Sequence, residues 1–260
     1  MFTHDDYCDL TGEEIARFAK LIRGADPGLR VPACRRWRLE DLIHHTGAIH
    51  RWATGLVAGR ARRGRAIAET DDWDPDASAA GRAGWIAFGG KRLLDTLRTT
   101  DPDTAMWAWG ADKHARFWSR RMTHETGVHR ADAELALGRE PRFTTAMAVD
   151  GVSEFLENLW YARAWRWSLG KLRGNGEKIR LVSTDTGDEW AITLGDSAPV
   201  WSRRAPNEGP GEGPDANVTV RADATSLYLM SWGRYKWNDA RCDVSGDTGL
   251  LRHWQRNSAV

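Results

Sequence analysis

The stretch LEDLIHHTGAIHRWATGLVA, residues 39–58, indicates how the first half of this 260-residue chain folds. Its apolar side chains recur every three or four residues, which is the spacing of one face of an α-helix. They are Leu39, Leu42, Ile43, Ile49, Trp52, Ala53 and Leu56. Gly47 and Gly55 lower the intrinsic helix propensity of the stretch. The pattern nevertheless predicts a long amphipathic helix that packs its apolar face in a core.

Residues on both sides of this stretch show the same helical periodicity. Residues 11–24 begin with Thr11, and Glu14 follows three residues later, which is the spacing of a capping box at a helix N-terminus. Further helices are expected at residues 78–98, 113–137 and 145–169. Long amphipathic helices with intervening loops are typical of a helical bundle. The sequence therefore predicts a helical domain over residues 1–172.

The pattern changes after Gly170, where apolar and polar residues begin to alternate as they do in β-strands. The expected elements are strands within KIRLVSTDTG (178–187), DEWAITLG (188–195) and ANVTVRAD (216–223), a Pro/Gly-rich loop over residues 202–217, a short helix over residues 224–237 and a last helix or turn over residues 246–255. The chain is therefore predicted to be an α+β protein whose second, small α+β domain covers residues 173–260.

The charge balance excludes some classes of partner. Lys and Arg together number 37 and Asp and Glu 36, so no net field attracts nucleic acid or an acidic membrane. The first residues lack the pattern of a signal peptide, and no apolar run reaches the ~18 residues of a membrane span. We expect a soluble, cytoplasmic protein. Its three cysteines, Cys8, Cys34 and Cys242, are far apart and form no CxxC pair, so a metal would need nitrogen and oxygen ligands.

RMTHETGVHRAD, residues 121–132, carries the residues of a candidate metal site. It is close to the zinc-protease signature HExxH, but its second histidine comes one residue late. A helix advances about 100° per residue, so His124 and His129 lie about 140° apart and cannot readily share an ion. Glu125 and His129 lie on one face, where a carboxylate and an imidazole can bind the same ion. Asp132 lies near that face and could orient the imidazole of His129.

A third ligand has to come from another helix, and residues 39–58 offer three histidines. His45 lies three residues after Leu42 and four before Ile49, so it falls within the apolar stripe and is expected to face the core. His44 projects about 100° away from it, and His50 about 140°. The helical geometry therefore selects His45.

Two imidazoles and one carboxylate suit Zn²⁺, and Fe²⁺, Ni²⁺ or Mn²⁺ would also accept them. They leave at least one coordination position open for a reacting ligand. The same spacing also occurs in solvated Glu–His contacts and in hydrogen-bonded core histidines, so spacing alone leaves both interpretations open.

Several motifs resemble those of the DinB-like superfamily and, within it, the actinobacterial mycothiol-dependent maleylpyruvate isomerase family. They are VPACRRWRLEDLIHHTGAIHRWA (31–53), FWSRRMTHETGVHRADAELALG (117–138), AVDGVSEFL (148–156), SLYLMSWGR (226–234) and VSGDTGLLRHW (244–254). The resemblance covers nearly the whole chain. It implies a metal-binding four-helix bundle followed by a small α/β, SCP2-like domain, with metal ligands at His45, Glu125 and His129.

The resemblance also implies a metal-dependent enzyme that uses mycothiol, a low-molecular-weight thiol. In the isomerase the thiol adds to a conjugated double bond, permits rotation and leaves. Other functions share the framework: a mycothiol S-transferase or metal hydrolase of secondary metabolism or detoxification, and a non-catalytic protein that binds metal or a ligand. We expect a small electrophilic acid as substrate and a monomer or homodimer.

A charged substrate would need a cation. Arg234 matches a family arginine that is expected to hold a substrate carboxylate. It also fits a surface arginine stacked on a neighbouring tryptophan. Arg120, Arg121 and Arg130 flank the predicted metal ligands and are alternatives, although helix-surface salt bridges are a common role for such residues.

Overall fold

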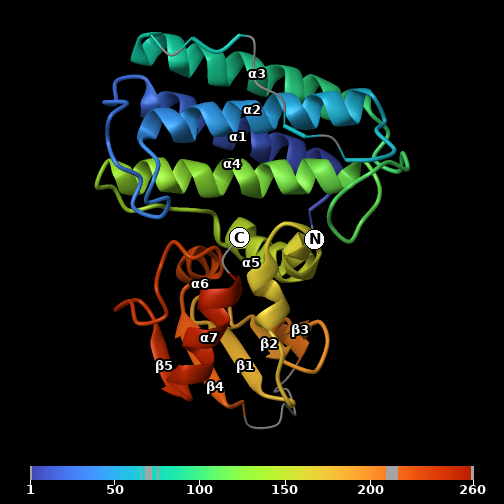
Figure 1. Ribbon diagram of the computed structural model, residues 1–260, viewed down its shortest axis with the longest axis vertical. Helices are drawn as coiled ribbons and strands as arrows, with labels where there is room; N and C mark the ends of the chain where they lie inside the picture. Colours follow the sequence, from blue (N-terminus) through green and yellow to red (C-terminus); the bar gives the residue numbers. More distant parts are fainter. Residues whose placement is uncertain (1, 65, 68–71, 75, 209–215, 259–260) are drawn as a thin grey trace. The chain divides into compact units, whose positions relative to one another are not determined.

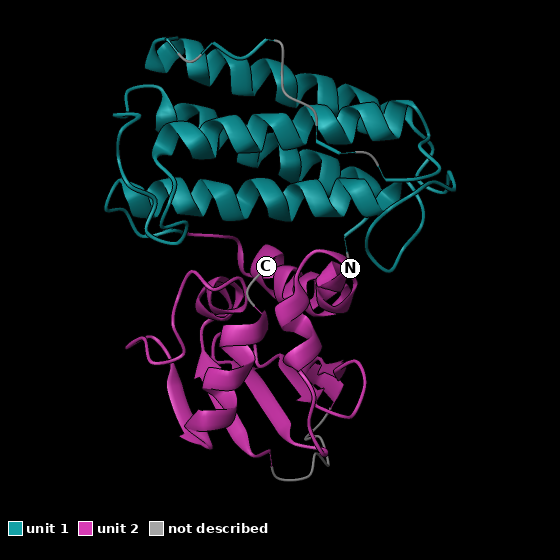
Figure 2. Ribbon diagram, viewed as in Figure 1, with its two compact units in different colours: residues 1–141 teal, residues 142–260 magenta. Residues whose placement is uncertain are grey.

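Long α-helices make up most of the first of two units into which the chain divides, residues 1–141 and 142–260 (Figures 1 and 2). The computed structural model describes residues 2–64, 66–67, 72–74, 76–208 and 216–258. In that part, unit 1 contains α1 (His4–Ile22), α2 (Leu39–Ala58), α3 (Ala79–Thr99) and α4 (Arg116–Ala136). Helix α1 contacts α3 and α4, and α2 contacts the same two helices. This closed ring of neighbours confirms the predicted four-helix bundle.

Helix α1 begins a full two turns before the predicted start. Thr3 precedes it, and the Thr3 hydroxyl accepts a hydrogen bond from the backbone N–H of Asp6 at 3.2 Å. The Asp6 carboxylate accepts in turn from the Thr3 backbone N–H at 2.7 Å, which completes a capping box. The cap expected at Thr11 was wrong, because the buried Thr11 hydroxyl donates to the carbonyl of Tyr7 inside the helix.

The contact between α2 and α3 explains why a glycine interrupts the apolar stripe of α2. A Cβ atom on Gly47 would lie 1.9 Å from Cζ3 of Trp85, which belongs to α3. The missing side chain lets the indole of Trp85 lie against the backbone of α2. Gly47 thus lowers helix propensity but permits close packing of the two helices.

Unit 2 combines a mixed sheet with short helices (Figure 1). Its described elements are α5 (Thr145–Leu159), the 3₁₀ segments η1 (Trp160–Ala164), η2 (Trp167–Lys171) and η3 (Pro206–Glu208), β1 (Lys178–Ser183), β2 (Glu189–Thr193), β3 (Val200–Arg204), β4 (Val218–Ala222), α6 (Ala224–Ser231), β5 (Asp243–Gly246) and α7 (Thr248–Ser258). The strand order is β3-β2-β1-β4-β5, with β1 and β4 parallel and the other pairs antiparallel. The predicted α+β class is confirmed.

The fifth predicted helix is shorter than expected and belongs to the second unit. Helix α5 ends at Leu159, whereas one helix was expected over the whole of residues 145–169. Its Ser153 accepts a hydrogen bond from the indole of Trp190 in β2 at 2.9 Å, and its Gly151 lies against the ring of Tyr228 in α6. The units therefore divide at 141/142 rather than at 172.

Strands β3 and β5 have no counterpart in the predicted elements. Both lie at edges of the sheet and are exposed along most of their length, so apolar and polar residues do not alternate in them. The loop expected over residues 202–217 begins within β3, and its segment 209–215 lies outside the described residues. Among the described residues, no helix combines the length and the apolar character that crossing a membrane requires.

Candidate metal centre

Helices α2 and α4 bring together the three residues that helical spacing selects. His45 comes from α2, and Glu125 and His129 come from α4. One ligand atom from each residue lies within 4.8 Å of the other two. Oε1 of Glu125 is 3.5 Å from Nε2 of His45 and 3.1 Å from Nε2 of His129. In the described part of the chain this is the one such group of three His, Cys, Asp or Glu residues.

The separations and the chemistry of this group fit a divalent ion. Neighbouring donor atoms around a tetrahedral ion with bonds of about 2.0–2.1 Å lie roughly 3.3 Å apart. The two distances to Oε1 of Glu125 bracket that value. Two imidazole nitrogens and one carboxylate oxygen are also a donor set that Zn²⁺ accepts in proteins, with room for a further ligand.

A row of polar contacts along α4 orients two of these ligands. Arg121, Glu125, His129 and Asp132 are three or four residues apart and share one face of the helix. Nη2 of Arg121 donates to Oε2 of Glu125 at 2.8 Å. Nδ1 of His129 lies 3.0 Å from Oδ2 of the buried Asp132. A carboxylate accepts hydrogen bonds, so Nδ1 is the donor to Asp132, and Nε2 is the nitrogen that faces Glu125 and would bind an ion.

The same contacts shift the pKa values of Glu125 and His129, the two candidate ligands on α4. Burial raises the pKa of Glu125, but the imidazole of His129, a hydrogen bond from His45 and the guanidinium of Arg121 outweigh it and hold that pKa well below its ordinary value. Burial lowers the pKa of His129, but Glu125 and Asp132 outweigh it and raise that pKa above its ordinary value. Both shifts favour the charged forms of the two residues, and an ion bound to Nε2 of His129 would replace a proton there.

Trp37 packs over the histidines of the group. Its ring centroid lies 4.8 Å from that of His45 and 6.1 Å from that of His129. Two backbone hydrogen bonds hold Trp37 in place. The carbonyl of Trp37 accepts from the N–H of Val31 at 3.0 Å, and the N–H of Trp37 donates to the carbonyl of Cys34 at 2.7 Å. The side chain of His45 is 32% exposed and that of His129 is 9% exposed, so the accessible side of the group lies at His45.

The other two histidines of α2 have different surroundings, as their helical phase predicts. The ring of His44 lies 4.9 Å from that of Trp73 and 6.2 Å from that of Trp85. His50 is fully buried, and its Nε2 lies 2.9 Å from the hydroxyl of Thr126 in α4. Neither belongs to the group that could hold an ion.

The arginines named as candidates to hold a substrate carboxylate lie in different surroundings. Arg130 is fully buried and forms ion pairs with Glu14 and Glu134, so its salt bridges lie in the core and not on the helix surface. Arg120 is half-buried. Arg234 follows α6 in unit 2, and its Nη1 donates to the carbonyl of Trp232 at 2.7 Å. A contact between Arg234 and a substrate carboxylate stays a prediction.

Sequence reasoning missed two residues at the site, Arg121 as the partner of Glu125 and Trp37 as the cover of His45. The spacing of four residues between Arg121 and Glu125 could have indicated the first. The position of Trp37 depends on how the connection before α2 folds, and helical periodicity carries no information about that connection.

Comparisons with known proteins agree with this architecture. The profile of the mycothiol maleylpyruvate isomerase N-terminal domain matches residues 8–134, and that of the family's C-terminal domain matches residues 146–253. Two crystal structures of the mycothiol-dependent maleylpyruvate isomerase, one of them a histidine-to-alanine mutant, are similar to the chain. For the mutant the TM-score is 0.60 at 12% sequence identity, and for the other it is 0.53 at 14%, and in both cases 95% of each chain is covered.

At such low identity the structural similarity shows a shared fold. No curated protein sequence matches the chain. The two domain profiles, however, together span most of its length, one over each unit. The chain belongs to the mycothiol-dependent maleylpyruvate isomerase family.

Proposed function

We propose that this protein is a metal-dependent enzyme that uses mycothiol to catalyse cis–trans isomerisation of maleylpyruvate or a closely related unsaturated acid. The observation that carries the proposal is the convergence of His45, Glu125 and His129, with one ligand atom of each within 4.8 Å of the others. Family membership supports the choice of thiol and of substrate class.

His45, Glu125 and His129 would hold the ion, and their two nitrogens and one oxygen favour Zn²⁺. An ion bound there would lower the pKa of a thiol, so that the thiol reacts as a thiolate near neutral pH. Asp132 would keep the imidazole of His129 in the tautomer that presents Nε2, and Trp37 would keep water from one side of the imidazoles.

The proposed reaction balances without an oxidant or a reductant. The thiolate forms a carbon–sulfur bond at the conjugated double bond, which thereby becomes a single bond and can rotate. Loss of the same thiolate restores the double bond in the trans arrangement. The thiol is regenerated, and this distinguishes isomerisation from a transferase reaction, in which the thiol stays on the product. Arg234 is the residue we propose to hold a substrate carboxylate.

The proposal is tested by following maleylpyruvate in the presence and absence of mycothiol, with added Zn²⁺. We expect turnover by the native protein with mycothiol, and loss of turnover in His45→Ala. His44→Ala is the matched control, since it removes the neighbouring imidazole, which packs against Trp73 and Trp85 instead. Accumulation of a stable thiol adduct would indicate a transferase, and turnover without thiol would contradict the proposed use of mycothiol.

A further inference from the structure

The two carboxylate oxygens of Glu125 have different partners. Oε1 faces both imidazoles, at 3.5 Å from Nε2 of His45 and 3.1 Å from Nε2 of His129. Oε2 accepts from Nη2 of Arg121 at 2.8 Å. The side chain of Arg121 is 3% exposed, so little water competes for this contact. A charge-assisted hydrogen bond at this distance is strong for a protein.

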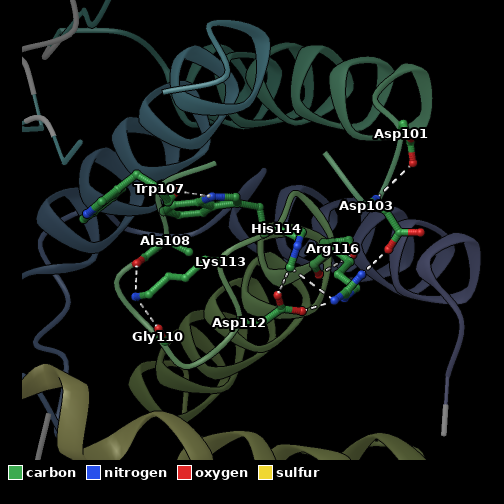
Figure 3. A network of polar contacts seen from close by, with 11 residues as sticks. Asp101, Asp103, Trp107, Ala108, Gly110, Asp112, Lys113, His114 and Arg116 are labelled. Carbon is green, nitrogen blue, oxygen red and sulfur yellow. Dashed lines mark hydrogen bonds and ion pairs between the residues drawn. The ribbon is translucent and has the colours of Figure 1, made fainter. Parts of the chain in front are cut away.

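Arg121 is itself supported from the connection that precedes α4. Its Cζ lies 5.9 Å from the ring centroid of Trp109, and that ring packs on Phe117 at 5.3 Å between centroids. The ammonium group of Lys113 donates to the carbonyls of Ala108 and Gly110, at 2.6 Å each, and these residues flank Trp109 in sequence (Figure 3). These two bonds hold the backbone on both sides of Trp109, and the contact with Phe117 holds the Trp109 ring near the guanidinium.

We propose that Arg121 is a positioning residue that makes Glu125 a one-oxygen ligand. This inference rests on the proposed metal site. A carboxylate can bind an ion through one oxygen or through both. If Oε2 of Glu125 turned toward the ion, the buried guanidinium of Arg121 would lose this hydrogen bond, which is costly. Glu125 therefore presents Oε1 alone, and the protein supplies three donor atoms instead of four.

This arrangement has a consequence for the reactants. Three protein donors leave a small ion such as Zn²⁺ room for one further ligand in its preferred tetrahedral geometry. A thiol needs a single position, whereas a keto acid that chelates through two oxygens needs two. Arg121 thus favours the thiol over the acid as the reactant that reaches the ion.

The test replaces the ion with Co²⁺, whose visible absorption is most intense in four-coordinate sites and weakens as the coordination number rises to five or six. Arg121→Met removes the donors at similar side-chain length. We expect the variant to bind Co²⁺ with a several-fold loss of visible absorption per bound ion, because Oε2 becomes free to bind. Arg92→Met, which removes an exposed cation on α3, is the control and should keep the native spectrum.

The possible outcomes test the metal site and the role of Arg121 separately. Failure of the native protein to bind Co²⁺ would contradict the metal site itself. Native binding with an unchanged spectrum in Arg121→Met would overturn the role of Arg121 and leave the site standing. If circular dichroism shows that Arg121→Met does not fold, Arg121→Gln takes its place, because glutamine stays polar but is uncharged and too short to hold Oε2. An unchanged spectrum would then overturn the proposal in the same way.

Discussion

His50 shows how burial sets the charge of a single residue. It lies fully buried in α2, with Nε2 2.9 Å from the Thr126 hydroxyl. Burial lowers the pKa of His50 to about 4, so the ring stays neutral at pH 7. In the unfolded chain the same imidazole takes up a proton near its ordinary pKa of 6.5. The unfolded state therefore binds more protons than the folded state between these two values.

The stability of the metal-free protein should consequently fall as the pH drops from about 6.5 to 4. His50 contributes at most about 3 kcal/mol to this loss, at about 1.4 kcal/mol per pH unit. Urea unfolding of the chelator-treated protein at several pH values measures it. His50→Gln, which can still bond to Thr126, should remove this part of the pH dependence. Equal slopes for the native protein and His50→Gln would contradict the assignment.

Gly47 is a second residue whose effect is specific to its position. Alanine would raise helix propensity by about 1 kcal/mol, but its Cβ would lie 1.9 Å from the ring of Trp85. Overpacking of this kind costs about 1–3 kcal/mol. We expect Gly47→Ala to lower the free energy of unfolding by up to about 2 kcal/mol in denaturant titrations.

Gly55 provides the control for this prediction within the same helix. A Cβ atom there would meet nothing within 4 Å. Gly55→Ala should therefore stabilise the protein by up to about 1 kcal/mol through helix propensity alone. Equal effects of the two substitutions would show that packing against Trp85 does not matter.

Helical phase explains why much of the candidate site could be predicted at the residue scale. It placed Glu125 and His129 on one face, separated His124 from them and selected His45 among three neighbouring histidines. It could not identify Trp37, because that ring reaches His45 through the fold of an irregular connection. The i, i+4 spacing of Arg121 and Glu125 could have indicated a contact between them, but spacing alone does not show which carboxylate oxygen the guanidinium binds.

At the scale of elements, a buried ion-pair network joins α1 to α4. Arg130 of α4 is fully buried and pairs with Glu14 of α1 and with Glu134 of its own helix. Glu14 also accepts from Nη1 of Arg17 at 2.7 Å. Removal of one partner from a buried pair is costly because the remaining charge has no water to solvate it.

Glu14→Ala should therefore lower the free energy of unfolding by roughly 3 kcal/mol. Glu13→Ala is the matched control, because Glu13 is the exposed neighbour of Glu14 in the same helix, and its replacement should change stability by no more than about 0.5 kcal/mol. Thermal unfolding monitored by circular dichroism measures both. A loss for Glu14→Ala no larger than that of the control would refute a stabilising role for the network.

Periodicity predicted whether most elements are helices or strands, but it did not predict the first and last residues of several of them. Helix α2 has the predicted bounds, because its apolar stripe is long and Gly59 follows its last residue. Helix α1 starts earlier because Thr3 and Thr11 carry the same capping pattern, and only the packing of Thr11 in the core distinguishes them. Strands β3 and β5 lie at sheet edges, where exposure on both faces removes the alternating pattern.

At the scale of the whole molecule, the division into units depends on which core a helix faces. Helix α5 has the periodicity of a bundle helix, so the sequence alone assigned it to the first domain. Its contacts with Tyr228 and Trp190 place it in unit 2. Amphipathic spacing shows that a helix has an apolar face, but it does not show which partner covers that face.

The candidate metal centre links α2 to α4, so ion binding should stabilise the bundle. An ion that binds the folded state alone adds about 4 kcal/mol when its free concentration is a thousand times its Kd. Chelation should therefore lower the melting temperature of the native protein in calorimetry, and readdition of Zn²⁺ should restore it. In His45→Ala, neither treatment should shift the transition. A chelator-sensitive transition in that variant would place the stabilising ion elsewhere.

The most direct test of the metal centre is a measurement of metal content by mass spectrometry on purified protein. Native protein, Glu125→Ala and His129→Ala would be compared after exposure to Zn²⁺ and removal of free ions. We predict that the native protein retains a stoichiometric divalent ion and that both variants lose most of it. A native protein without stoichiometric metal, or variants that retain it unchanged, would contradict the site.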